Sequence, residues 1–422
     1  MLKPHPSPMP ERPAAHNLSG RADVIVLGAG VVGVTTAYSL ARRGLKVAIV
    51  DRAEGPGRGT SFANGAQLSY AYTDALGSPA MLKKLPMFAL GRDPSFRIQA
   101  TVDPAFLEWG LRFLRNCTSA RFSRNTRAAL ALALESRLAM HALIERHPFD
   151  FGHEVAGKMH LFYDRTAFAA AREVMDLKRG HGAVQNALSP QEAMAIEPAL
   201  AGAEGLEGVI HSPEDEVGDP FRFASGLLDI LVRDYGVETH FGFDADRLRI
   251  ERGSVAITDA AGATITGDRL AVCLGVAAPR FLRKAGIRVP IWPMKGYSFT
   301  AAPGEMAPRV SITDTARKIV FCSLAGRMRV AGLAELGAWD PSRDDQPLQA
   351  LVGLARQSLP GAAAYEALES EWAGLRPMSP SSVPIISRPR PELLLNIGHG
   401  MLGWTFAMGA AERAASLIDR QD

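Results

Sequence analysis

The chain has 422 residues, of which 47% are hydrophobic and 22% charged, and its formal net charge is only +3. This length and hydrophobic content suffice for two domains with their own cores, and the small net charge gives no support to a nucleic-acid partner. The three cysteines, Cys117, Cys273 and Cys322, are odd in number, far apart and outside any CxxC pair, so the sequence indicates neither a disulfide framework nor a zinc site.

Residues 1–20 are rich in proline and lack the continuous apolar core of a signal peptide, so we expect a disordered leader. No stretch is long and apolar enough for a transmembrane helix, and a cytoplasmic protein is favoured. The Lys83–Lys84 pair, within the apolar segment Met81–Leu90, fits peripheral contact with the inner face of the cytoplasmic membrane. It fits a solvated loop or a core-facing helix equally well.

The segment Val24–Asp51 predicts a βαβ unit that binds a dinucleotide. An apolar run leads into a glycine turn, a helical pattern continues to Arg43, and a second apolar run ends at Asp51. Gly28 permits the tight turn, Gly30 lets a pyrophosphate approach the helix N-terminus, and Gly33 lets helix and strand pack closely. Asp51 can take the adenosine ribose hydroxyls, which favours FAD or NAD over NADP. The cofactor-binding candidates in this unit are Gly28, Gly30, Val31, Val32, Gly33, Asp51 and Arg52.

The middle of the chain alternates loops, helices and strands. Residues 54–72 form a loop rich in Gly, Ser and Asn whose length suggests that it lies along a ligand. Residues 103–147 carry apolar side chains at helical spacings, and we expect these helices in a second domain. Asp219 and Pro220 predict the start of a helix that Gly236 ends. Strand-like runs follow at 237–243, 254–258, 270–274 (ending before Gly275), 297–300, 319–323 and 328–331.

The C-terminal segment predicts a second ligand-binding turn. A short apolar strand, Leu393–Ile397, precedes a flexible turn that contains His399, and a helix begins near Trp404. The N-terminus of that helix would again present backbone N–H groups to an anionic group. An NAD site usually lies within one contiguous domain, whereas the longer FAD can be held by both ends of a chain. We therefore favour FAD.

These elements predict an α/β fold with a Rossmann-like FAD-binding domain and a second, α+β substrate domain built from insertions. The expected FAD-binding domain comprises residues 21–80, 204–290 and 371–422. The expected substrate domain comprises residues 81–203 and 291–370.

Several segments are specific enough to indicate a family: TSFANGAQLSY at 60–70, FLRNCTSA at 113–120, PMKGYS at 293–298, GLRPMSP at 374–380 and NIGHGMLGWT at 396–405. With these segments, the chain resembles the FAD-dependent D-amino acid dehydrogenase family, within the superfamily of D-amino-acid oxidases and glycine oxidases. The resemblance runs from about residue 21 to the C-terminus.

The resemblance implies roles for individual residues. Arg376, in the GLRP segment, would bind the substrate carboxylate, and Lys295 and Tyr297 would lie on the substrate side, although Tyr297 fits the role of an ordinary sheet aromatic about as well. His399 between two glycines would serve by its backbone or its ring, and we do not assign it as a catalytic base. The further residues that would line the flavin are Thr60, Ser61, Asn64, Gln67, Gly275, His399, Gly400, Gly403, Trp404 and Thr405.

The implied reaction is oxidation of a D-amino acid to an imino acid, with the α-hydrogen passing as hydride to flavin N5 and water later releasing a 2-oxo acid and ammonia. Electrons would pass to a quinone or another acceptor. Three alternatives stay open: a dehydrogenase of D-hydroxyproline or a similar cyclic amine, a flavin-binding subunit of a hetero-oligomeric dehydrogenase, and a nicotinamide-dependent dehydrogenase.

One departure from the family pattern concerns Ser381 and Ser382, which stand where relatives often carry an Asp-Gly pair. No metal-ligand cluster stands out among the ten histidines, so we predict no metal.

Overall fold

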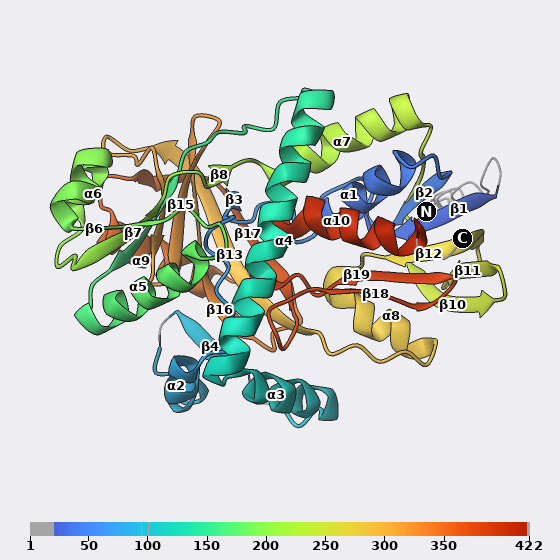
Figure 1. Ribbon diagram of the computed structural model, residues 1–422, viewed down its shortest axis with the longest axis horizontal. Coiled ribbons are helices and arrows are strands. Elements are labelled where there is room, and N and C mark those ends of the chain that lie inside the picture. Colours follow the sequence, from blue (N-terminus) through green and yellow to red (C-terminus); the bar gives the residue numbers. More distant parts are fainter. Residues whose placement is uncertain (1–20, 94, 100, 420–422) are drawn as a thin grey trace, which may run out of the picture.

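The computed structural model describes residues 21–93, 95–99 and 101–419, and the expected leader at residues 1–20 lies outside them. The described chain forms two large β-sheets that lie side by side with helices packed around them (Figure 1). The α/β class expected from the sequence is confirmed.

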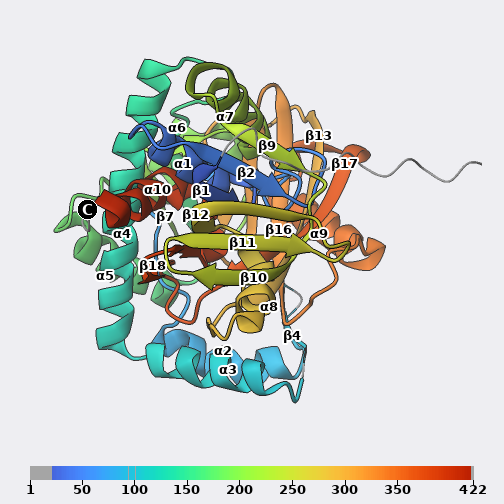
Figure 2. The same ribbon diagram turned by 90° about the vertical axis from the view of Figure 1, so that its right-hand side faces the viewer.

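An eight-stranded sheet contains the predicted βαβ unit and is called the nucleotide sheet below. Its order is β10-β11-β12-β1-β2-β9, and β19 pairs with β12 and β18. β9, β2, β1, β12 and β19 run parallel, which brings their carboxyl ends to one edge. Figure 2 looks onto this sheet. Its strands are β1 (Ala22–Leu27), β2 (Val47–Asp51), β9 (Glu238–Phe241), β10 (Ala245–Glu251), β11 (Ser254–Asp259), β12 (Thr264–Val272), β18 (Ile385–Arg390) and β19 (Leu393–Ile397).

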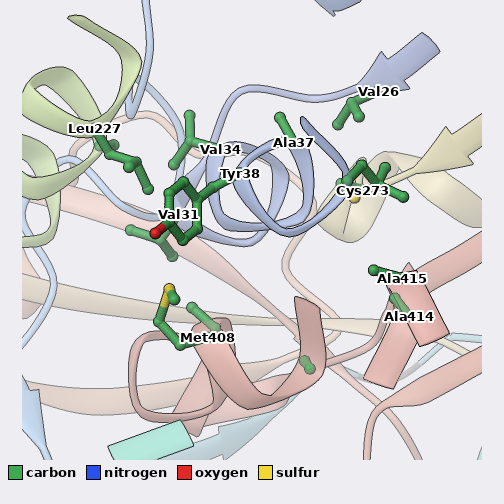
Figure 3. Close-up of a cluster of buried hydrophobic side chains, with 14 of the residues drawn as sticks. Val26, Val31, Val34, Ala37, Tyr38, Leu227, Cys273, Met408, Ala414 and Ala415 are labelled. Carbon is green, nitrogen blue, oxygen red and sulfur yellow. The ribbon is translucent and has the colours of Figure 1, made fainter. Parts of the chain in front are cut away.

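Helices pack on both faces of the nucleotide sheet. One face carries α1 (Val31–Ala41), α7 (Pro220–Tyr235), α10 (Gly403–Asp419) and α4 (Ser119–Arg146), and the other carries α8 (Ala278–Lys284). Figure 3 shows part of the core on the first face, where Val34 and Tyr38 of α1 meet Leu227 of α7 and Met408 of α10. Glu412 of α10 also pairs with Arg42 and Arg43 at the end of α1. The two ends of the chain are therefore joined directly.

A nine-stranded sheet, called the second sheet below, has the order β17-β13-β16-β15-β14-β5-β7-β6, with β4 paired to β16. Its strands are β4 (Phe96–Ile98), β5 (Lys158–Phe162), β6 (Asn186–Leu188), β7 (Gly208–Ser212), β13 (Trp292–Pro303), β14 (Ser311–Asp314), β15 (Ile319–Leu324), β16 (Arg327–Leu336) and β17 (Ala363–Met378). The remaining helices are α2 (Pro79–Ala89), α3 (Pro104–Asn116), α5 (Arg165–Arg179), α6 (Pro190–Ile196), α9 (Asp345–Ser358) and the 3₁₀ turns η1 (Pro198–Gly202), η2 (Gly275–Ala277) and η3 (Gly400–Leu402).

Several details differ from the sequence-based expectation. The helical pattern at 103–147 is two helices, because α3 ends before Cys117 and the Thr118 side chain caps α4 at the Arg121 N–H. α4 packs on α10, and its Leu132 and Met140 belong to the core cluster of α1 and α10 rather than to that of the second sheet. β7 pairs with β5 in the second sheet, although residues 204–290 were expected in the FAD-binding domain. The loop at 54–72 contains a two-residue strand, β3 (Gln67–Leu68), which pairs with β8 (Glu216–Val217).

The close contact of α1 with the glycine turn generates the first prediction. A Cβ atom at Gly33 would lie 1.7 Å from the Gly28 carbonyl oxygen, which is backbone and cannot move aside. We expect Gly33→Ala to lower the free energy of unfolding by more than about 3 kcal/mol and to reduce the bound FAD. Thermal unfolding and the flavin content of the purified protein measure both effects.

Gly353→Ala is the matched control, because Gly353 is an exposed residue of α9 with open space around its Cβ position. That substitution should be neutral or stabilise by up to about 1 kcal/mol. Equal flavin content and Tm in the two variants would contradict the role given to Gly33.

Candidate functional site

A cavity of about 710 Å³ lies between the carboxyl edge of the nucleotide sheet and the face of the second sheet. Leu27, Asp51 and Cys273, at or after the ends of β1, β2 and β12, form one wall. Val320 and Ala331, on β15 and β16, belong to the other. A cavity at the carboxyl edge of parallel strands is the usual place for a dinucleotide in an open α/β sheet.

The glycine turn after β1 has the geometry that the sequence predicts. Gly28 has φ +110°, and a Cβ atom there would lie 2.6 Å from the Cys273 carbonyl oxygen. The Val31 N–H, in the first turn of α1, donates to Ser61 Oγ over 3.1 Å. Gly30 lines the cavity, whereas Gly33 does not and serves the packing of α1 instead.

Asp51 is held at the cavity wall by backbone hydrogen bonds. Its Oδ2 accepts from the Ala29 N–H at 2.6 Å, and its Oδ1 accepts from the Ala53 N–H at 2.8 Å. The carboxylate thus ties the glycine turn to the end of β2 and still lines the cavity next to Arg52. Arg280 and Lys284 of α8 line the cavity as well.

The polar residues of the 60–67 loop line the cavity, and several of them also anchor the loop to the second sheet. Thr60 Oγ1 donates to the Leu375 carbonyl at 2.6 Å, and Gln67 Nε2 donates to Ser311 Oγ at 2.5 Å. Asn64 Oδ1 accepts from the Ala66 N–H at 2.9 Å. All of them, with Ser61, line the cavity as the sequence suggested.

The C-terminal turn reaches the same cavity from the opposite end of the chain. Gly398 and Gly400 have φ +77° and +58°, and His399 between them is 4% exposed. Burial lowers the pKa of His399 to about 3, so the ring is neutral, and its Nε2 atom has no hydrogen-bond partner. Gly275, Gly400, Gly403 and Trp404 line the cavity with it, whereas Thr405 lies behind and accepts from the Ser69 N–H at 3.0 Å.

Arg376 brings a positive charge into the cavity. Its Nη1 donates to the Leu333 carbonyl at 3.0 Å, and within the described residues no carboxylate forms an ion pair with it. Burial lowers the pKa of the guanidinium to about 10, so it stays charged at neutral pH. The group lies over Gly296, where a Cβ atom would be 2.1 Å from Nη2. The glycine of the PMKGYS segment thus makes room for this arginine.

Lys295 is not brought to Arg376. Met294 and Gly296 line the cavity, but side chains alternate along β13, and Lys295 lines a second cavity of about 630 Å³ with Glu335. Tyr297 lines the first cavity, yet its hydroxyl donates to Glu335 at 3.0 Å, and burial raises its pKa. Lys295 Nζ lies 5.1 Å from the centre of the Tyr297 ring. The structure therefore gives no support to Lys295 as a substrate-binding residue.

Ser381 and Ser382 have local roles. Ser382 has φ +63°, a left-handed conformation that glycine adopts at lower cost. Its Oγ accepts from the Leu76 N–H at 2.9 Å, and Leu76 lines the cavity. Ser382 therefore supports the wall of the cavity, whereas Ser381 Oγ accepts from the Val383 N–H at 3.3 Å within the same turn.

Sequence reasoning missed several cavity residues, among them Tyr72, Lys158, Thr313, Lys318 and Trp372. It also missed a cluster away from the cavity. His141 and His153 place their Nε2 atoms 2.6 and 2.7 Å from the two oxygens of the buried Glu216. The described residues thus contain one possible metal-ligand group, but both carboxylate oxygens already accept hydrogen bonds, and Arg137 Nε lies 4.0 Å away.

The residues present fit FAD. A side chain at Gly28 or Gly33 would collide with backbone at the phosphate-binding turn, and the buried, unpartnered His399 Nε2 offers a hydrogen-bonding atom at the other turn. The cavity reaches from Asp51 to Trp404, so both ends of the chain can hold one extended cofactor.

The chain belongs to the FAD dependent oxidoreductase family, whose model matches residues 23–417. It is 40% identical over 410 residues to D-amino acid dehydrogenase 2 of Ralstonia nicotianae, with 94% of this chain and 96% of that protein covered. It is 37% identical over 404 residues to D-amino acid dehydrogenase of Dechloromonas aromatica, with the same coverage of 94% and 96%. The resemblance stated from the sequence is confirmed, and FAD is the cofactor.

Solved structures share the fold. Glycine oxidase from Geobacillus kaustophilus is similar with a TM-score of 0.73 at 21% identity, covering 95% of both chains. L-proline dehydrogenase from P. horikoshii is similar with a TM-score of 0.74 at 18% identity, covering 95% of this chain and 94% of that one.

The hydrogen bonds of Asp51 generate a prediction about cofactor affinity. Asp51→Ala removes the acceptor of the Ala29 N–H and loosens the glycine turn. We expect the Kd for FAD to rise by about ten- to a hundredfold, the equivalent of about 1–3 kcal/mol. Titration of the deflavinated protein with FAD, followed by flavin fluorescence, measures this.

Asp23→Ala is the control, because the Asp23 carboxylate accepts from the Lys46 N–H at 2.8 Å at the opposite end of the same strands. It should leave the Kd for FAD within about twofold of the wild type. If both variants bind FAD equally well, Asp51 has no part in cofactor binding.

Proposed function

We propose that the chain oxidises D-amino acids to 2-oxo acids and ammonia and passes the electrons to a quinone or a similar acceptor. The observation that carries this proposal is Arg376, a cavity-lining guanidinium without a carboxylate partner among the described residues. Its planar fork suits a substrate carboxylate. The names of the relatives from Ralstonia nicotianae and Dechloromonas aromatica support a D-amino acid as the substrate.

The residues of this chain would bind, orient and shield the substrate. Arg376, whose guanidinium lies over Gly296, would fix the carboxylate and so orient the substrate. FAD, when bound, accepts the two electrons that the substrate loses. The N-terminus of α10 would stabilise negative charge that lies next to it. His399, neutral and buried, would offer a hydrogen bond without adding charge.

No base is required of the protein if the amine arrives neutral. Tyr297, engaged with Glu335, and Lys295, in the second cavity, are accordingly left out of the proton transfers. Within the proposed site, the cofactor-binding residues are Gly28, Gly30, Val31, Val32, Asp51, Arg52, Thr60, Ser61, Asn64, Gln67, Gly275, His399, Gly400, Gly403 and Trp404.

The proposed acceptor suggests contact with a membrane surface. None of the helices in the described part of the chain could cross a bilayer. The outer side of α3 exposes Leu107, Leu111 and Leu114, which recur at i, i+4 and i+7 and are 55%, 58% and 43% exposed. Next to them α2 exposes Lys83 and Lys84, and both views place the two helices together at one end of the molecule (Figures 1 and 2).

This surface, α2 together with α3, has the composition of a peripheral membrane contact, in which leucines enter the interface and lysines meet anionic lipids. We propose it as the face that meets the membrane. α2 buries Phe88 and leaves Lys83 and Lys84 in solvent, where both lysines are free to meet anionic lipids.

Arg376 gives the sharpest test of the proposed substrate. Anaerobic bleaching of the bound flavin across D- and L-amino acids, prolines and N-methyl amino acids should show the greatest rate with a D-amino acid. Arg376→Ala should lower kcat/KM for the best substrate, because one partner of a partly desolvated ion pair is lost. The expected loss of transition-state stabilisation is about 2–5 kcal/mol. Flavin content should stay normal.

Arg376→Lys is the conservative comparison and should recover only part of the loss, since an ammonium cannot make the two-point contact. If the Arg376→Ala variant has a kcat/KM within about threefold of the wild-type value, the substrate carboxylate binds elsewhere. If a proline bleaches the flavin and D-amino acids do not, a cyclic amine replaces D-amino acids as the proposed substrate.

The membrane surface has its own test. Wild-type protein should co-sediment with vesicles that contain phosphatidylglycerol and less with vesicles of phosphatidylcholine alone. The double variant Leu107→Glu/Leu111→Glu should lose at least about tenfold in vesicle affinity, because two apolar side chains no longer enter the interface.

Leu138→Glu controls for the loss of an exposed leucine, since Leu138 is 73% exposed on α4 and lies outside this surface. Equal vesicle binding by the double variant and the control would overturn the assignment. If the wild-type protein does not bind vesicles but forms a dimer through α3, the partner of this surface is a second copy of the chain.

A further inference from the structure

Lys158 lines the cavity and has no part in the function proposed above. It begins β5, where Met159 and Leu161 point into the core of the second sheet. Lys158 and His160 therefore lie on the opposite face of the strand, yet they are only 4% and 0% exposed. The Tyr72 ring covers them, stacked on His160 with the ring centres 3.6 Å apart.

The ammonium of Lys158 is buried without a carboxylate ion pair in the described part of the chain. Its Nζ donates to Ser69 Oγ at 2.5 Å, and it lies 5.3 Å from the centre of the Tyr72 ring. Burial lowers the pKa of Lys158 to about 8, against the attraction of the buried Asp215, so at neutral pH the group is largely charged. Burying an ammonium that no carboxylate contacts directly is unfavourable, and a negatively charged or carbonyl-rich occupant of the cavity would reduce this cost.

Lys178 offers a contrast on the other side of the same ring. Its Nζ lies 5.2 Å from the centre of the Tyr72 ring, but it pairs with Asp74 at 2.7 Å and does not line the cavity. Of two buried lysines that flank one tyrosine, one has a carboxylate partner within the chain and the other faces the cavity.

The position of Lys158 points to the part of the cavity next to α10. Ser69, which holds the Lys158 ammonium, donates its N–H to Thr405 Oγ1 at 3.0 Å in the first turn of α10. The buried hydroxyl of Thr313, another cavity residue, has no partner. A buried ammonium and an unpartnered hydroxyl thus line the cavity, and Ser69 links the ammonium to the first turn of α10, a combination that would stabilise an anionic or carbonyl-rich group.

The substrate carboxylate is not that group. Arg376 is on β17 and Lys158 on β5, and the strands β13, β16, β15 and β14 lie between them. With neighbouring strands about 4.8 Å apart, the backbones that carry the two cations are on the order of 20 Å apart along the sheet, so the two residues line different parts of the cavity.

We infer that Lys158 is a cofactor-binding residue that supplies a positive charge to the pyrimidine end of the flavin ring, where negative charge gathers when the ring is reduced. The inference rests on the proposed placement of the ring between residues 60–67 and the start of α10. The Lys158 ammonium would add a full positive charge to the dipole of α10. Its attraction for negative charge on the ring would be strong because water is excluded.

The test measures the flavin itself and needs no substrate. Sulfite adds to oxidised flavin and leaves negative charge on the ring, so its Kd reports the positive charge at the pyrimidine end. In Lys158→Met holoenzyme we expect sulfite affinity to fall at least tenfold. We expect the two-electron midpoint potential to become more negative by about 30 mV, the same tenfold factor. Lys158→Arg should restore most of both quantities.

Lys178→Met is the matched control and should leave sulfite affinity and midpoint potential at their wild-type values, because Lys178 does not face the cavity. Unchanged values in Lys158→Met, or equal changes in both lysine variants, would overturn the inference. So would a Lys158→Met variant that keeps the wild-type potential and loses only affinity for D-amino acids with acidic side chains, since the substrate would then be the occupant. If no D-amino acid reduces the wild-type flavin, the proposed function fails, while sulfite affinity and potential still decide the role of Lys158.

Discussion

The approach of α1 to the turn that precedes it is the constraint on which the cavity depends. The Cβ position of Gly33 falls on the Gly28 carbonyl, and that of Gly28 falls on the Cys273 carbonyl after β12. Without side chains at these two positions, α1 starts at the carboxyl edge of the nucleotide sheet and its first N–H groups face the cavity. The same seating brings α1 against α10, where Thr35 Oγ1 donates to the Ala407 carbonyl at 3.1 Å. The C-terminal turn is thereby aimed at the same cavity.

Patterns that are local in sequence predicted this half of the site well. The order of strand, glycine turn, helix, strand and acid from Val24 to Asp51 is set by short-range propensity and packing, and the structure reproduces it. The cap at Asp219 was found for the same reason, since its Oδ1 accepts from the N–H groups two and three residues later. Arg376 and the C-terminal turn were identified through segments typical of a family, and they line the cavity.

What the sequence could not supply depends on how distant strands cover one another. The run Lys158–Leu161 alternates polar and apolar residues, which usually indicates a strand with one face in solvent. Only the fold shows that the loop with Tyr72 covers the polar face, so that Lys158 becomes a buried cation. The position of Lys295 depends on the fold in the same way. Alternation along β13 puts Lys295 on the face away from Gly296, and only the structure shows that Gly296 lies under Arg376.

The placement of charge in the cavity also suggests how FAD and substrate depend on each other. Arg376 and Lys158 lie in a poorly solvated space and donate to neutral acceptors, a carbonyl and a hydroxyl; neither forms an ion pair with a carboxylate among the described residues, although the buried Asp215 attracts Lys158. A cofactor bound next to Lys158 would reduce the cost of burying that ammonium. It would also reduce the open volume of the cavity around Arg376. Arg376 would then face a smaller, drier volume in which its attraction for a carboxylate is stronger. Cofactor binding would in this way prepare the substrate site, even though the strands β5 and β17 that carry the two cations are separated by four other strands of the second sheet.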